Sequence, residues 1–273
     1  MNGVEAMLKA LGGAAPPPSL ARVVFEETKG NPFFVEEVFR HLAEEGQLFD
    51  PDGQWRSGLR ADELRVPSSV RLVVGKRLDR LGPDARRVLT TAAVIGRSFS
   101  VRLLEQVENA KADEALDAVE EAERAQLVTA EPGGRDPRYR FVHELVRHTL
   151  ADGLSLRRRQ RLHARIADAM ERVYAAGVDS HAPALAHHLF QAGAAADTDK
   201  ALRFLFIASS QAAAAAADEE ALEHAGNALG LIEDERSARG AELLVQRANA
   251  LHSMKRPAGA MEAYERALDL FEE

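Results

Sequence analysis

Histidines are the residues of this chain whose spacing could bring metal ligands together. His143 and His148 are five positions apart. On a helix this places them about 140° apart, whereas a helical HExxH zinc site needs both on one face. His181, His187 and His188 are close enough in sequence to form a cluster, but histidines scattered over repeat helices are commonly surface or interhelical residues. We therefore expect no metal site.

The sequence lacks the residue patterns that bind nucleotide phosphates or supply a catalytic nucleophile. The single Gly–Lys pair, Gly75 and Lys76, is followed by Arg77 and has Val70 where a phosphate-binding GxxxxGK[ST] loop needs its first glycine. There is no cysteine, so thiolate chemistry and disulfides are excluded. No nucleophile elbow or paired-carboxylate arrangement stands out. We expect that the chain is not an enzyme by itself and holds no cofactor of its own.

His143 has two interpretations. Tyr139, Phe141 and His143 alternate along an expected strand, so the histidine ends an aromatic row that faces inward. It is either a boundary histidine whose ring is satisfied by a backbone carbonyl, as buried polar groups commonly are, or an imidazole that points at an anionic group brought by another domain.

The sequence GNPFFVEE at 30–37 predicts a sharp corner between two helices. Gly30 can end one helix in a left-handed conformation, Asn31 can cap the next, and Pro32 suits its first position. The apolar residues after the corner share one helical face, and Glu36, Glu37 and Arg40 point elsewhere. The residues expected on the apolar face are Phe34, Val35, Val38, Phe39 and Leu42.

The middle of the chain has the element order of a winged helix. We expect helices at 83–95, 101–107 and 112–125, with Leu116, Val119 and Ala122 of the third facing inward, and then strands at 127–131 and 138–143. The third helix of such a module reads the DNA major groove. Here the segment 111–127 has six acidic residues against two basic ones, so a phosphate backbone would repel it.

The C-terminal part predicts helical hairpin repeats. Residues 259–271 align with residues 220–232 at an offset of 39, which is longer than the usual tetratricopeptide spacing of about 34. Ala260, Tyr264 and Ala267 match the second helix of such a repeat, for which 242–254 would be the first. A separate turn signal at 50–53 predicts a small hairpin near 47–56.

Composition bounds the class of protein. The chain has 273 residues, 46% of them hydrophobic, and a net charge of −8. The negative charge argues against general binding of nucleic acid or an anionic membrane. No signal peptide or apolar membrane span is evident, so we expect a cytoplasmic protein with no membrane partner. The fold class is expected to be mainly α with two short β-hairpins.

Four motifs resemble a known family. GNPFFVEE at 30–37, VPSSVRLVVGKRLDRL at 66–81, AAVIGRSF at 92–99 and YRFVHELVR at 139–147 are similar, in order and spacing, to the region after the ATPase core of bacterial STAND signal-transduction ATPases. These AAA-type regulators often carry a LuxR-type DNA-binding domain or a cyclase domain. The resemblance implies a helical lid at 1–80, a winged-helix domain at 81–152 and tetratricopeptide-like repeats at 153–273.

The resemblance also implies a role for four residues. Gly30, Asn31 and Pro32 look like the family's glycine-x-proline motif, whose proline packs against adenine. His143 looks like the winged-helix histidine that reaches the phosphates of ADP. The phosphate-binding core would belong to an upstream domain, so ATP or ADP would be bound by the full-length protein rather than by this chain.

Three functions are compatible with these features. The leading one is the regulatory part of such an ATPase, which couples nucleotide state to a protein or small-molecule inducer at the helical repeats. The alternatives are a freestanding winged-helix transcription regulator, which would need a basic DNA-binding face, and a repeat scaffold for protein interactions. We do not expect nucleic acid binding through this chain.

Overall fold

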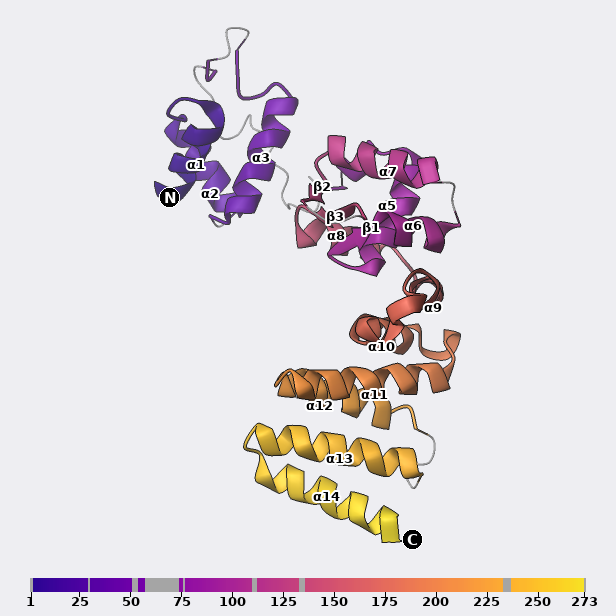
Figure 1. Cartoon of the computed structure of the whole chain (residues 1–273). Coiled ribbons are helices and arrows are strands. Elements are labelled where there is room, and N and C mark those ends of the chain that lie inside the picture. The colour runs from indigo at the N-terminus through magenta and orange to yellow at the C-terminus, as the bar shows by residue number, and fades with distance from the viewer. Residues whose placement is uncertain are drawn as a thin grey trace.

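A computed structural model describes residues 2–28, 30–50, 54–56, 74–75, 77–109, 112–132, 136–232 and 237–272. The fold of this described part is mainly α with one small three-stranded sheet, as expected for the class. Three groups of elements follow one another along the chain, with the N-terminal helices at one end and α14 (Pro257–Glu272) at the other (Figure 1). Within the described part, no helix is long and apolar enough to cross a membrane.

The first group consists of three short helices around an apolar core. They are α1 (Asn2–Gly12), α2 (Pro18–Thr28) and α3 (Pro32–Glu44). Leu8, Leu20 and Leu42 are fully buried between them. The aromatic rings of Phe39, Phe49 and Trp55 extend this core, with 4.9 Å between the ring centroids of Phe49 and Trp55.

Among its described residues, the hairpin expected near 47–56 contains one β-bridge. Phe49 pairs with Trp55 in antiparallel fashion, and Asp50 accepts a hydrogen bond from the backbone N–H of Gln54 at 2.9 Å. Residues 51–53, the expected tip, lie outside the described residues. The indole Nε1 of Trp55 donates to the carbonyl of Ala14 at 3.1 Å, which ties the hairpin to the end of α1.

The second group surrounds the sheet. Its helices are α5 (Pro83–Ile95), α6 (Val101–Glu108), α7 (Ala112–Arg124) and α8 (Glu144–Asp152), and its strands are β1 (Ser98–Ser100), β2 (Val128–Glu131) and β3 (Arg138–Phe141). The strand order is β1-β3-β2, and both pairings are antiparallel. The expected hairpin of β2 and β3 is present, whereas β1 was not anticipated because its three residues pair with a strand far along the chain.

One residue of α7 faces the other way from our expectation. Val119 and Ala122 are fully buried, but Leu116 is 37% exposed. The inward face is made instead by Ala115 and Ala118, which stand at helical spacing with Val119 and Ala122. Leu116 is one residue past Ala115, so it is turned about 100° away from this face.

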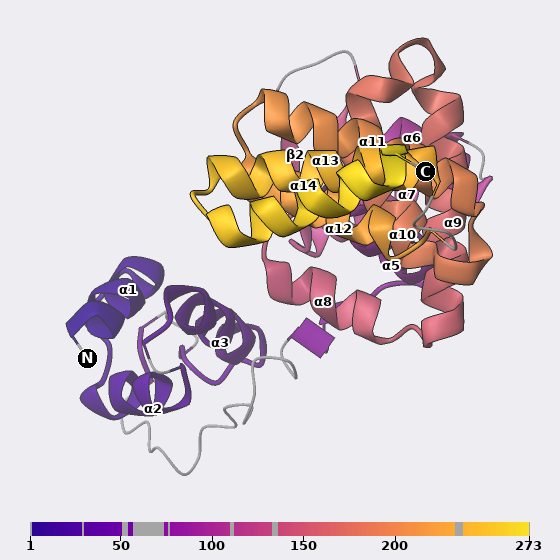
Figure 2. The same cartoon turned by 90° about the horizontal axis from the view of Figure 1, so that it is seen from below.

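The third group is a stack of helices. It comprises α9 (Leu156–Val173), the 3₁₀ segment η1 (Ala175–His181), α10 (Ala182–Ala192), the 3₁₀ segment η2 (Gly193–Ala195), α11 (Thr198–Ala214), α12 (Asp218–Leu229), α13 (Ala238–Ser253) and α14. Each α-helix packs on the next one in the chain. The aligned segments 220–232 and 259–271 start on α12 and α14, the second helices of successive hairpins (Figures 1 and 2).

The second and third groups share apolar contacts. Val94 at the end of α5 and Leu103 and Val107 of α6 are buried in the same cluster as residues of α9 to α14. Ile95 packs against this cluster and also against the core around the sheet. The helical stack therefore packs against the ends of α5 and α6, in addition to being connected to the second group by the polypeptide chain.

Candidate functional site

The Gly-Asn-Pro corner has the predicted local geometry. Gly30 has a φ of 75°, in the left-handed region, after the end of α2. Asn31 caps α3, because its side-chain oxygen accepts a hydrogen bond from the N–H of Phe33 at 3.1 Å. Pro32 occupies the start of α3 and is exposed. The corner thus presents the pyrrolidine ring on the surface, at a rigid helix N-terminus.

His143 lies just after β3 and is the N-cap of α8. Its Nδ1 accepts a hydrogen bond from the N–H of Leu145 at 3.0 Å. Partial burial lowers the pKa of His143 below its usual value, with smaller opposing and reinforcing contributions from Glu144 and Arg97. Because the neutral ring has one proton and Nδ1 is an acceptor, Nε2 must be the N–H donor. The backbone partner is therefore an N–H group, not the carbonyl of our first interpretation.

The structure brings the corner and the histidine together. The rings of Phe33 and His143 are stacked, with 3.5 Å between their centroids and 16° between their planes. Phe33 is in the first turn of α3 and His143 caps α8, so the N-termini of the two helices are adjacent. A helix N-terminus carries a partial positive charge and free N–H groups. Two of them beside an Nε2–H donor make a place that favours an anionic group.

A buried ion pair holds α3 one turn beyond Phe33. Arg77 Nη1 contacts Glu37 Oε1 at 3.0 Å and Oε2 at 2.9 Å, and both residues are buried. Burial raises the pKa of Glu37, and the charges of Arg77 and Arg40 oppose this rise. We expected Glu37 to point away from the apolar face of its helix, and no local pattern showed that Arg77 would cover it. The motif that contains Arg77 is described in part, because residues 66–73 and 76 lie outside the described residues.

Polar contacts across the junction continue this connection. Arg40 of α3 donates to the side chain of Gln126, which precedes β2, and Arg80 pairs with Glu44 at 2.6 Å. Within the second group, Arg147 of α8 donates to the carbonyl of Ala93 on α5 at 3.1 Å, which ties α8 to α5. The position of α3 relative to the sheet is therefore set by aromatic stacking and by hydrogen bonds together.

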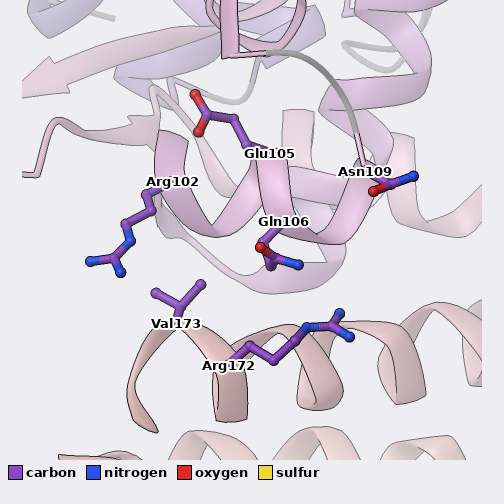
Figure 3. A pocket seen from close by; sticks show the side chains of 6 residues that line it. All are labelled: Arg102, Glu105, Gln106, Asn109, Arg172 and Val173. Atoms are coloured by element: carbon purple, nitrogen blue, oxygen red, sulfur yellow. The ribbon is translucent and has the colours of Figure 1, made fainter. Parts of the chain in front are cut away.

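A separate hollow of about 370 Å³ lies between α6 and the end of α9. Figure 3 shows Arg102 and Gln106 on α6 facing Arg172 and Val173 on α9, with the guanidinium groups of Arg102 and Arg172 on opposite sides of the opening. Glu105 and Asn109 complete its lining. This hollow contains neither Phe33 nor His143, so it is not part of the junction between α3 and α8.

The histidines of the helical stack are arranged differently from our expectation. His181 stacks on Tyr174 with 3.8 Å between ring centroids, away from the group we considered. His187 and His188 are joined instead by His163 of α9, and ligand atoms of these three rings all lie within 4.8 Å of one another. Sequence reasoning missed His163 because only the crossing of α9 and α10 brings it to the other two.

No family model matches the chain. It is similar to an uncharacterized protein of Rhizobium meliloti (strain 1021), with 30% identity over 225 residues. The aligned region is 79% of this chain and 20% of the relative, so the chain spans about a fifth of the length of the curated protein it matches.

Proposed function

We propose that this chain is the regulatory region of a STAND-type signal-transduction ATPase. In this proposal α1 to α3 form a helical lid, α5 to α8 with the sheet form a winged helix, and α9 to α14 are tetratricopeptide-like repeats. The region works in the cytoplasm and closes on a nucleotide held by an upstream domain. It has no catalytic group of its own.

The stack of Phe33 on His143 carries the proposal. The family resemblance implies that the motifs at 30–37 and 139–147 both touch the bound nucleotide. The rings from the two motifs lie 3.5 Å apart. Two motifs that contact one ligand must be neighbours in the closed state, and these two are.

The chemistry of the junction suits ADP. The Nε2–H of His143 is a donor that a phosphate oxygen can accept, and the N-termini of α3 and α8 add favourable electrostatics for an anion. Pro32 is exposed beside them and offers an apolar ring to an adenine face. ADP would then hold α3 and α8 together, and its loss would favour an open arrangement in which the two separate.

The DNA-binding alternative gains no support from α7. Its exposed face carries Asp113, Glu114, Asp117 and Glu120, which would place four carboxylates against the phosphates of a DNA groove. Such a surface opposes the electrostatic attraction on which nearly all non-specific DNA affinity depends. We therefore assign the winged helix to contacts with protein and nucleotide.

The helical stack offers a place for the inducer. A hollow of about 520 Å³ is lined by Leu202 of α11, by Leu231 and Ile232 after α12, and by the pair Asp199 and Arg239. The charged groups of this pair are 3.5 Å apart. Mixed apolar and paired charged lining is typical of sites for small organic molecules. A ligand here would change how the repeat helices pack on one another. The repeats contact the winged helix through α9, so such a change could reach it.

Nucleotide retention tests the proposal. In the protein that includes the upstream nucleotide-binding domain, we expect His143→Asn to release bound ADP faster than the wild type. Asparagine is a good N-cap, so α8 keeps a capping acceptor while the ring and its Nε2–H are lost. His148→Ala, which alters an exposed histidine of the same helix, is the matched control. Equal ADP release by His143→Asn and wild type would refute the assigned role.

A further inference from the structure

Three imidazole rings converge where α9 crosses α10. His163 comes from α9, and His187 and His188 are consecutive on α10. Their ring centroids form a nearly equilateral triangle with sides of 5.9, 5.1 and 5.4 Å. Within it, Nδ1 of His163 is 2.9 Å from Nδ1 of His188. His163 and His188 are buried, whereas His187 is exposed.

We propose that His163, His187 and His188 bind one divalent transition-metal ion of the zinc class. This site is separate from the junction of α3 and α8, and the proposal does not depend on the nucleotide role of His143. The sequence alone predicts no metal site, and it is the unexpected position of His163 that changes this conclusion.

The spacing of the rings fits such an ion. Three atoms that lie within 4.8 Å of one another have a common point no more than about 2.8 Å from each, and zinc–imidazole bonds are about 2.0–2.1 Å long. Inward shifts of less than about 1 Å per nitrogen therefore complete the coordination. Two nitrogens of a tetrahedral zinc site are about 3.3 Å apart, which is close to the 2.9 Å between His163 and His188.

The rings are in the form that a metal ion needs. Burial lowers the pKa of His163 to about 4 and that of His188 to about 3, and partial desolvation of the more exposed His187 also lowers its pKa. All three are therefore neutral near pH 7, and a neutral imidazole has the lone pair that coordinates zinc. No proton has to be expelled from the site, because the proton of the His163–His188 hydrogen bond can move to the other nitrogen of its own ring.

A backbone contact orients one ligand. The ring of His188 hydrogen-bonds the backbone of Ile95. Histidines that ligate metal ions commonly use their second nitrogen in this way, which fixes the tautomer and the ring plane. Since Ile95 is the last residue of α5, an ion at this site would stiffen the seat of the helical stack on the second group of elements.

The charges around the cluster are mixed. Arg159 on α9 and Arg147 on α8 are near enough to lower the pKa values of His163 and His187, respectively, and so oppose a cation. Glu223 on α12 acts on His187 in the opposite sense. The exposed side of His187 gives the ion access and leaves room for water as a fourth ligand, as in zinc sites with three protein ligands.

Metal titration tests this proposal on the whole chain. After treatment with a chelator and its removal, zinc is titrated by calorimetry, and cobalt(II) is added as a visible-light probe because zinc has no absorption of its own. We expect one ion per chain, a cobalt spectrum typical of tetrahedral coordination, and a melting temperature that rises with zinc concentration.

Single substitutions locate the ion. His187→Ala alters an exposed side chain, so it should fold, and we expect it to weaken zinc binding by about tenfold or more. His163→Asn provides a second ligand variant, with circular dichroism to verify its fold. His252→Ala, on the exposed side of α13, is the control and should bind as the wild type does. Absence of zinc binding by the wild type, or unchanged binding by His187→Ala, would overturn the proposal in favour of a plain hydrogen-bonded histidine pair.

Discussion

The ring of Phe33 lies nearly parallel to the imidazole of His143, with 3.5 Å between centroids. This contact joins the first turn of α3 to the cap of α8. It places an apolar ring against one face of the imidazole. The contact has consequences for stability that can be measured without any nucleotide.

A double-mutant cycle measures the coupling between these rings. We expect Phe33→Leu and His143→Asn to destabilise the chain non-additively, with a coupling free energy of about 0.5–1.5 kcal/mol, as for other aromatic pairs. Urea unfolding of the two single variants and the double variant gives this energy. Strictly additive effects would show that the stack contributes nothing.

The buried pair of Glu37 and Arg77 should be sensitive to the loss of one partner. We expect Glu37→Gln to lower the free energy of unfolding by about 3–5 kcal/mol, because it leaves the Arg77 guanidinium buried without its counter-charge. Replacing both residues by methionine removes both charges and should restore much of the loss. A double variant that is as unstable as Glu37→Gln would argue that the residues act through packing alone.

The stability contributed by Glu144, at the start of α8, should depend on pH. A hydrogen bond from Arg147 is the main reason that the pKa of Glu144 lies below its ordinary value of 4.5. A carboxyl whose pKa is lowered by folding stabilises the protein above its unfolded pKa, and this contribution is lost as the pH falls through the folded pKa. We therefore expect Glu144→Gln to be less stable than wild type at pH 7.

The same comparison supplies its own control. Denaturation at pH values below the folded pKa of Glu144 should give a smaller difference between Glu144→Gln and wild type, since both side chains are then neutral. A difference that stays constant from pH 7 into the acid range would contradict the electrostatic origin.

Gly12 provides an optical test of the N-terminal group. The chain has one tryptophan, Trp55, and a Cβ on Gly12 would run into its indole. We expect Gly12→Ala to displace the ring and to shift its fluorescence emission toward the red, because more of the indole then meets water. Gly3→Ala lies in the same helix with nothing near its Cβ, so it should leave the emission unchanged.

Short-range sequence patterns predicted the helices and turns whose ends are set by neighbouring residues. The boundaries of α5 and α7 and the corner at Gly30 follow from proline, capping and helical periodicity, and the structure has them where the sequence placed them, within a residue. The strands β2 and β3 are slightly shorter than expected. The family resemblance implies that both motifs touch one nucleotide, but no local rule relates Phe33 to His143, so the stacking of these two rings was not predicted.

Features that depend on long-range packing were missed. The three residues of β1 are too few for a strand pattern, and their partner Arg140 is far along the chain. The burial of Glu37 depends on Arg77, and the histidine cluster depends on His163 at a helix crossing. In each case the sequence shows the residue type but not the neighbour that gives it a role.

Ile95 packs into the core around the sheet and also into the core of the helical stack. Water that entered between these two parts at Ile95 would therefore uncover apolar atoms of both cores. Separating the two parts between α8 and α9 would therefore expose, on each of them, apolar surface that the other part now covers.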